Sequence, residues 1–241
     1  MKSNRLILAL DLETLSEAER IVDLLKSRIS IFKIGLQLFT REGPKAIEMV
    51  RQKGCKVFLD LKYHDIPNTV AGAAIEATRL GVSMFTIHTL GGEEVMKRCR
   101  DAVIETSLKG NIIRPMIIGV TVLSSLDQKA ITALGINHTI REQALRLSKM
   151  ALMSGLDGVV ASPEEVKSIR ESCGEDFIIV TPGIRPAGDP SGKGIPLDDQ
   201  KRVMAPKDAI REGADYLVIG RPILMAEDSL AAAERILREI L

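Results

Sequence analysis

The sequence has few of the features that several large classes of binding protein require. Its 241 residues contain no tryptophan, and aromatic residues make up only 3%. Single-stranded nucleic acids are bound by stacking bases on aromatic rings, so this shortage argues against such a partner. The 33 Lys and Arg residues nearly balance the 32 Asp and Glu residues, and a net charge of +1 gives no overall field that would attract nucleic acid or an anionic membrane. Any anion must therefore be bound locally.

Cysteine and long apolar runs are equally scarce. Cys55, Cys99 and Cys173 are far apart and form no CxxC pattern, which argues against a disulfide framework or a structural zinc and favours the reducing cytoplasm. The apolar run Leu6 to Leu10 ends at Asp11 and is too short for a signal peptide. No run approaches the roughly eighteen apolar residues of a membrane-spanning helix, so we expect no contact with a membrane.

What the sequence does contain is a regular alternation of short apolar segments and helical patterns. Ser16 followed by Glu19 has capping-box spacing and predicts the start of the first helix. One apolar face of the last helix is predicted from Leu230, Ala233, Leu237 and Leu241. Eight segments are apolar nearly throughout and are predicted to be strands: Leu6 to Asp11, Ile31 to Leu36, Lys56 to Lys62, Ser83 to His88, Pro115 to Val122, Gly158 to Ala161, Phe177 to Thr181 and Tyr216 to Gly220.

Strands that are apolar on both faces are typical of a parallel sheet covered by helices. Eight β-α alternations therefore predict an α/β fold, a single (β/α)8 TIM barrel that spans residues 1–241. A doubly wound open sheet is the alternative. It is disfavoured because Asp11, Leu12 and Glu13 follow the first strand, where such a sheet would carry GxGxxG.

One segment, Gly183 to Leu197, is rich in glycine and proline and is predicted to be neither helix nor strand. It follows the seventh predicted strand, which in a barrel places it on the face that carries the chemistry. A long loop in that place is typical of an active-site lid.

Charged residues gather where the predicted strands end. Asp11 ends the first strand, Lys33 lies in the second, and Asp60 and Lys62 close the third. Asp60 and Lys62 are two residues apart, so both side chains should enter the barrel from one face of the strand. A structural ion pair is the simpler interpretation, but a buried pair returns little net stability. Alternating Lys and Asp would instead keep one another ionised and could hold a lysine as a proton donor.

Asp65 lies close to this group and is open to two interpretations. It could complete the alternation of charges, or it could cap the helix that begins near Pro67.

Glycine and arginine follow both of the last two predicted strands. Gly183 and Arg185 come after the seventh, and Gly220 and Arg221 come after the eighth. In barrels these strand ends commonly bind a phosphate, because glycine lets backbone N–H groups approach the anion and arginine neutralises it. We therefore expect a phosphate site here.

The segment Asp60-Leu-Lys-Tyr-His-Asp-Ile-Pro-Asn-Thr69 resembles the signature of the orotidine 5′-phosphate decarboxylase family. Supporting segments follow in the expected order along nearly the whole chain: Leu8 to Asp11, Phe32 to Gln37, His88 to Gly92, Val120 to Leu123, Val180 to Arg185 and Tyr216 to Pro222. Members of this family decarboxylate orotidine 5′-phosphate to uridine 5′-phosphate in pyrimidine biosynthesis. The resemblance implies the same reaction here, as a lyase that needs no cofactor and no metal.

The resemblance also implies roles for individual residues. Lys62 would protonate C6 of the pyrimidine, and Asp60 would lie against the substrate carboxylate. Lys33 and Asp65 would complete the charged network. The expected substrate contacts are Asp11 and Lys33 at the ribose, Ser124 at the pyrimidine, and Pro182, Arg185, Gln200, Gly220 and Arg221 at the pyrimidine and phosphate. Ser124 stands where many members have threonine and keeps the hydroxyl, and Lys193 to Leu197 resembles an insertion before Gln200.

Assembly is a further implication of the resemblance. Members form homodimers with shared active sites, in which Asp65, Ile66 and Thr69 would reach the site of the partner subunit.

Two alternatives stay open. Keto-gulonate phosphate decarboxylase and hexulose phosphate synthase are related phosphate-binding barrels, but they use magnesium with a glutamate where this sequence has Lys33, whose charge would repel a divalent ion. The other alternative is a catalytically silent nucleotide-binding barrel, which would most simply have lost a lysine or aspartate of the network.

Overall fold

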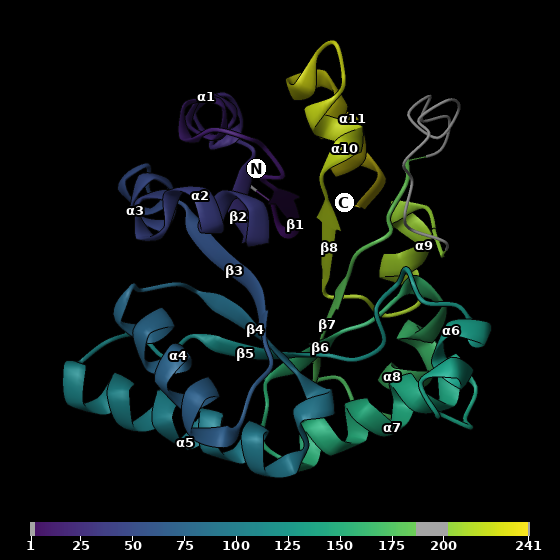
Figure 1. Cartoon of the computed structure of the whole chain (residues 1–241). Helices are drawn as coiled ribbons and strands as arrows, with labels where there is room; N and C mark the ends of the chain where they lie inside the picture. Colours follow the sequence, from purple (N-terminus) through teal and green to yellow (C-terminus); the bar gives the residue numbers. More distant parts are fainter. Residues whose placement is uncertain (1–2, 187–201, 241) are drawn as a thin grey trace.

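Eight parallel strands close into a barrel in the order of the sequence, with β8 paired to β1 (Figure 1). This computed structural model describes residues 3–186 and 202–240. The strands are β1 (Ser3–Ala9), β2 (Ile29–Gly35), β3 (Lys56–Tyr63), β4 (Met84–His88), β5 (Met116–Val120), β6 (Gly158–Val160), β7 (Ile178–Thr181) and β8 (Tyr216–Ile219). Every predicted strand is present within three residues of its expected bounds. The predicted TIM barrel is confirmed, and the open sheet is excluded because no edge remains between β1 and β8.

Helices surround the barrel and connect successive strands (Figure 1). They are α1 (Leu15–Leu25), α2 (Leu36–Glu42), α3 (Pro44–Gln52), α4 (Pro67–Arg79), α5 (Glu93–Gly110), α6 (Gln128–Ala133), α7 (Ile140–Met153), α8 (Val166–Cys173), α9 (Pro206–Arg211), α10 (Arg221–Leu224) and α11 (Ser229–Ile240), with short 3-10 turns η1 (Thr89–Gly91) and η2 (Pro163–Glu165). Within the described ranges, none of these helices combines the length and apolar character needed to cross a membrane.

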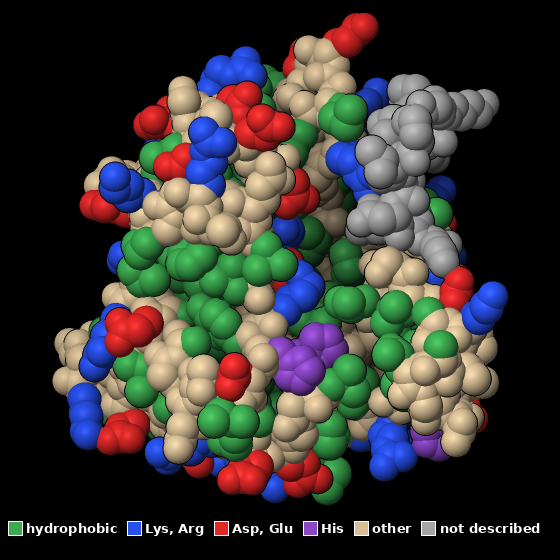
Figure 2. Space-filling model, viewed as in Figure 1, with side chains coloured by type: hydrophobic (Ala, Val, Ile, Leu, Met, Phe, Trp, Pro, Cys, Tyr) green, Lys and Arg blue, Asp and Glu red, His purple; other side chains and the backbone are tan. Residues whose placement is uncertain are grey.

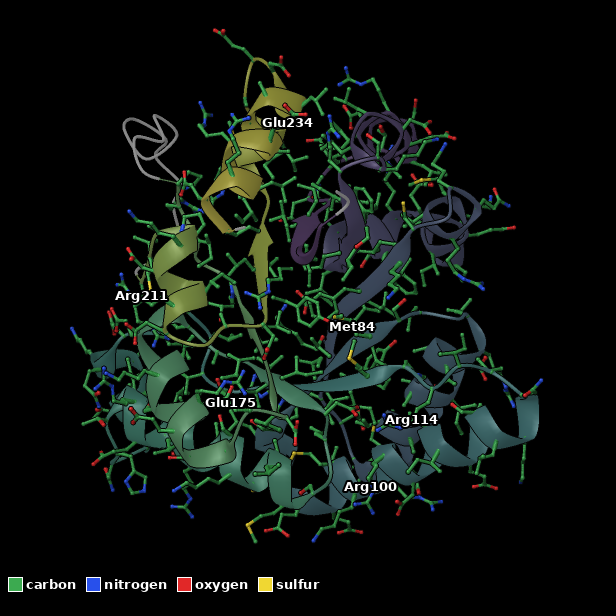
Figure 3. The ribbon with its side chains drawn as sticks, turned by 180° about the vertical axis from the view of Figure 1, so that it is seen from behind. Met84, Arg100, Arg114, Glu175, Arg211 and Glu234 are labelled. Carbon is green, nitrogen blue, oxygen red and sulfur yellow. The ribbon has the colours of Figure 1, made fainter. Side chains whose placement is uncertain are left out.

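The hydrophobic core has two main parts, and a third, small cluster lies between α6 and α7. The larger part fills the layer between strands and helices and includes Phe32, Leu59 and Phe85, each fully buried. The smaller part fills the barrel interior with side chains such as Ile7, Phe58 and Met84, the last of which is labelled at the centre of Figure 3. The barrel interior is therefore a packed core rather than an open pore.

The first helix begins two residues earlier than predicted. Its N-cap is Thr14, whose hydroxyl accepts from the Glu17 N–H at 3.2 Å, while the Glu17 carboxylate accepts from the Thr14 N–H at 3.1 Å. The Ser16 and Glu19 capping box was a wrong prediction. Thr14 to Glu17 has the same spacing, and the earlier pair caps the helix because Ser16 already lies inside it.

Two Asp–Arg pairs tie neighbouring strands together at the amino-terminal end of the barrel. The Asp157 carboxylate, just before β6, accepts from Arg114 at 2.8 and 3.0 Å and from the Ile117 N–H of β5 at 2.7 Å. Asp215 repeats the arrangement before β8, with Arg170 at 2.6 Å and the Ile179 N–H of β7 at 2.7 Å. Figure 3 labels Arg114 near this rim. Charge-assisted hydrogen bonds here stabilise the fold at the end opposite to the chemistry.

We expect Asp157→Asn to lower the free energy of unfolding by about 1.5 to 3 kcal/mol, because charge-assisted bonds to Arg114 and to a strand N–H are weakened together. The matched control is Asp101→Asn, which alters a more exposed Asp–Arg pair on α5 and should cost under about 1 kcal/mol. Urea denaturation of both variants measures the difference. Equal losses of stability in the two variants would show that the hydrogen bonds of Asp157 stabilise the fold no more than a surface ion pair does.

Candidate active site

The charged residues of the candidate site lie next to the apolar side chains that fill the barrel, one step closer to the carboxyl ends of the strands. Ile31 and Phe58 point into the barrel from β2 and β3. Lys33 and Asp60 follow each of them by two residues, and because side chains alternate along a strand they enter the same interior closer to the carboxyl end. The apolar side chains that fill the barrel and the charged side chains above them thus come from the same strands.

Four of these side chains form an alternating row of charge. The Lys33 ammonium lies 3.2 Å from an Asp11 carboxylate oxygen and 3.7 Å from an oxygen of Asp60. The Lys62 ammonium donates to both oxygens of Asp60, each at 2.9 Å. The structure therefore brings Asp11, Lys33, Asp60 and Lys62 together in that order. Gly35 makes room for the row, because a Cβ there would lie 2.9 Å from the Lys33 nitrogen.

The backbone at Lys62 is strained. Its φ is 51°, in the left-handed region that a long L side chain rarely adopts. The Thr86 hydroxyl on β4 supports this conformation, because it accepts from the Lys62 N–H at 2.8 Å and donates to Asp60 at 3.0 Å. One buried threonine therefore fixes both members of the Asp60–Lys62 pair.

The Asp60 carboxylate stays ionised although it is almost fully buried. Burial on its own would raise its pKa, but the charges of Lys33 and Lys62 and the hydrogen bonds from Lys62 and Thr86 outweigh that effect and hold the pKa below its usual value. At neutral pH the cavity thus contains a fixed negative charge between two lysines.

The row opens into a cavity of about 240 Å³ at the carboxyl ends of the strands. Figure 2 shows Lys and Arg side chains in the hollow at the centre of this face. The lining residues are Asp11, Lys33, Phe58, Asp60, Lys62, Val120, Val122, Leu123, Ser124, Val160, Ala161, Ser162, Val180, Pro182, Arg185, Val218, Gly220 and Arg221. Four basic and two acidic side chains among them leave two net positive charges, which suits an anionic ligand.

Most of the predicted site residues share this cavity. Ser124 follows β5, Pro182 and Arg185 follow β7, and Gly220 and Arg221 follow β8. Gly220 lies close to the first strand, because a Cβ there would be 3.3 Å from the Cβ of Ala9. Gln200 and the segment Lys193 to Leu197 lie outside the described residues.

Asp65, Ile66 and Thr69 do not line the cavity of their own chain. All three are exposed, Ile66 by 68%. The alternative that Asp65 caps the next helix is wrong. The N-cap of α4 is Ile66 without a side-chain cap, and the Asp65 carboxylate accepts from the N–H of Ile66 at 2.6 Å instead.

A pair of histidines borders the charged row. The rings of His64 and His88 stack at 5.0 Å, and Figure 2 shows two neighbouring histidines beside the central hollow. Burial, followed by the charges of His64 and Lys62, lowers the pKa of His88 to about 4. His88 is therefore neutral at physiological pH and adds no positive charge beside Lys62.

Several residues that line the cavity or support its charged row were not predicted from the sequence. Thr86 gave a weak signal, as a polar residue inside an apolar strand two positions before His88. Ser162 follows β6 and lines the cavity, but a serine after a strand has no distinctive pattern. The apolar lining, for example Val160 and Val218, was predicted only as part of strands.

The comparisons with known proteins agree with this geometry. The family model described as the orotidine 5′-phosphate decarboxylase / HUMPS family matches residues 4–236. The chain belongs to this family. An orotidine 5′-phosphate decarboxylase of Moorella thermoacetica is 50% identical over 238 residues, which cover 98% of this chain and 92% of the relative. One of Syntrophotalea carbinolica is 48% identical over 236 residues, with 98% and 94% covered.

Solved structures extend the agreement to the fold. The crystal structure of orotidine 5′-phosphate decarboxylase from Lactobacillus acidophilus superposes with a TM-score of 0.84 at 37% identity and covers 99% of each chain. An uncharacterized conserved protein from Geobacillus kaustophilus reaches the same TM-score at 32% identity, covering 98% of this chain and 100% of the other.

We expect Thr86→Val to lower the free energy of unfolding by about 1 to 3 kcal/mol, because the Lys62 N–H and Asp60 each lose a buried partner. Thr86→Ser keeps both hydrogen bonds and should recover most of the loss. The control is Thr78→Val on α4, whose hydroxyl donates to the Ala74 carbonyl, a group that retains its helical partner. Urea denaturation that finds Thr86→Val as stable as Thr78→Val would contradict the proposed support of Lys62.

Proposed function

We propose that this protein decarboxylates orotidine 5′-phosphate to uridine 5′-phosphate, a step of pyrimidine biosynthesis, with Lys62 as the proton donor. The observation that carries the proposal is the row Asp11, Lys33, Asp60 and Lys62 at the mouth of a barrel that belongs to the orotidine 5′-phosphate decarboxylase / HUMPS family. Such a row holds an ammonium group in one place beside the cavity, ready to act on a developing negative charge.

The reaction requires the bond between C6 and the carboxylate carbon to break, and carbon dioxide leaves while the electron pair stays on C6. That carbanion has no conjugated group into which its charge can spread. The Lys62 ammonium would stabilise it electrostatically and then donate a proton to C6. Asp60, which accepts both hydrogen bonds from Lys62, fixes the ammonium and would lie against the substrate carboxylate.

The rest of the cavity supports a nucleotide monophosphate. Arg221 and Gly220 after β8, with Arg185 and Pro182 after the neighbouring β7, would hold the phosphate and one side of the pyrimidine, because arginine binds phosphate through paired hydrogen bonds. Ser124 would hydrogen-bond the pyrimidine. Asp11 and Lys33 would contact the ribose hydroxyls, and Gln200 would join the phosphate side.

The magnesium-dependent relatives are a poorer match to the site. The Lys33 ammonium lies 3.7 Å from Asp60 and 3.2 Å from Asp11, where it would repel a divalent ion held by those carboxylates. We therefore propose a reaction without metal or other cofactor. A catalytically silent barrel is disfavoured as well, because every charged member of the row is in place.

We also propose a homodimer with shared active sites as the working form in the cytoplasm, with neither nucleic acid nor membrane as a partner. Leu36, Ile66 and Leu90, which follow β2, β3 and β4, are exposed by 58%, 68% and 48%. Figure 2 shows hydrophobic side chains gathered on the face beside the histidine pair. An apolar face next to the cavity would be buried by a second copy, which would bring Asp65, Ile66 and Thr69 to the partner's site.

The first test compares orotidine 5′-phosphate with orotidine, which lacks the phosphate. We expect the wild type to decarboxylate the phosphate ester in the presence of a chelator. The change in absorbance as the substrate is consumed measures the reaction. Arg221→Ala should lower kcat/KM for the phosphate ester by a factor that corresponds to about 2 to 4 kcal/mol of activation free energy. The loss for orotidine should be far smaller, because only the ester uses the arginine. Wild type without turnover would refute the proposed function, and equal losses on both substrates would place Arg221 outside the phosphate site.

The second test concerns Asp65 across the dimer. Lys62→Ala and Asp65→Ala proteins, each inactive, are mixed under conditions that exchange subunits. A mixed dimer then has both lesions in one site and none in the other, so random exchange should restore roughly a quarter of wild-type activity. If Asp65 served its own chain, every site would keep a lesion. A mixture that stays inactive after mass spectrometry has shown exchange would contradict the shared site.

A further inference from the structure

A second charged pair lies behind the cavity wall and has no part in the chemistry described above. Glu165, at the end of η2, is 1% exposed, and Arg202 is 7% exposed. Their side chains form an ion pair through Arg202 Nη1 and Glu165 Oε1. The two residues are 37 positions apart in the sequence. Neither touches the cavity, since both are missing from its lining.

This pair is poorly explained as a source of stability. Within the part of the chain that the structure describes, Glu165 Oε2 and Arg202 Nε are buried without a hydrogen-bond partner. Burial raises the pKa of Glu165 to about 7, and the nearby charge of Glu164 adds to this rise, although the charges of Arg202 and Arg141 oppose it. A carboxylic acid with a raised pKa makes the folded state less stable as it ionises. An incompletely satisfied buried pair of this kind is typical of a functional constraint.

The pair joins three walls of the cavity. Arg202 Nη2 donates to the Leu123 carbonyl at 3.3 Å, and Leu123 and Ser124 form the wall that follows β5. The Glu165 N–H donates to the Ser162 carbonyl at 3.0 Å, in the wall that follows β6. These strands and β7 are neighbours in the barrel (Figure 1).

The third wall, after β7, is tied to Arg202 through the backbone. Met204, two residues beyond Arg202, donates its N–H to the Gly183 carbonyl at 3.2 Å and accepts from the Arg185 N–H at 2.9 Å. Ile184 and Met204 form a parallel bridge. Arg202 is therefore linked through Met204 to the backbone of Arg185, which lines the cavity on the side proposed for the phosphate.

We propose that Glu165 and Arg202 are positioning residues, whose ion pair holds the Leu123–Ser124 wall and the Gly183–Arg185 wall at the separation that the nucleotide requires. This inference rests on the proposed function, because it assigns the two walls to the pyrimidine and the phosphate. Loss of the pair should displace both walls, and small displacements of binding groups cause large losses of efficiency.

The test measures kcat and KM for orotidine 5′-phosphate, and calorimetric binding of uridine 5′-phosphate, in three variants. Arg202→Met should raise KM and weaken uridine 5′-phosphate binding about tenfold or more, with a smaller change in kcat, because binding groups rather than the proton donor are displaced. Arg202→Lys keeps the charge but only one of the two contacts, and should recover part of the loss. The matched control is Arg114→Met, which breaks an Asp–Arg pair at the other end of the barrel and should lower thermal stability with KM unchanged.

A pH profile separates positioning from a structural role. Glu165 forms the ion pair only when it is ionised, so Glu165→Gln should reduce kcat/KM about tenfold at pH 8 and by less than about twofold at pH 6, where the wild-type carboxyl is already protonated. The substrate phosphate, with a pKa near 6, titrates equally in both proteins and cancels in the ratio.

The outcomes separate the two proposals. An inactive wild type that still binds uridine 5′-phosphate contradicts the proposed decarboxylation, while the variants still report on the walls through binding. Unchanged KM and binding in Arg202→Met, or a ratio of wild type to Glu165→Gln that does not vary with pH, overturns the positioning role. Wild-type protein that neither turns over nor binds contradicts both.

Discussion

The buried carboxylate of Asp60 is the constraint on which the rest of the site depends. A charge that is almost fully removed from water is tolerated only with opposite charges and hydrogen bonds around it. Lys33, Lys62 and Thr86 supply them, and they lower the pKa of Asp60 in spite of its burial. The same contacts that keep Asp60 ionised fix the ammonium group of Lys62 beside the cavity.

The residues that stabilise the barrel and the residues of the candidate site lie at different positions along the barrel axis. Apolar side chains such as Phe58 fill the interior, and Asp157 and Asp215 tie the strands at the amino-terminal end. The charged row and the proposed phosphate side occupy the carboxyl end, where the loops that follow the strands meet. The left-handed backbone of Lys62 lies at this end too. The packed apolar interior below the site helps such strain to persist, because the surrounding contacts hold the strands in place.

The fold could be predicted because its signal is periodic. Eight apolar segments with helices between them specify a parallel barrel whatever the details of each loop, and chemistry-bearing residues at strand ends are then brought together by geometry alone. Two kinds of contact could not be predicted from this periodicity. In one, neighbouring residues compete for the same role; in the other, the two partners lie far apart in the sequence. Thr14 caps the first helix in place of Ser16, and the partner of Glu165 lies 37 residues away on a segment without a pattern. The left-handed conformation of Lys62 depends on Thr86 from another strand, so no local pattern reveals it.

The central claim is that the ammonium group of Lys62 provides both the positive charge and the proton that decarboxylation needs. The most direct measurement is the turnover of orotidine 5′-phosphate by Lys62→Ala, together with its thermal stability and its affinity for uridine 5′-phosphate. Loss of a proton donor and of a preorganised charge together should reduce kcat by roughly four orders of magnitude or more, in a protein that stays folded and binds the product. Turnover within about tenfold of the wild type would contradict the claim.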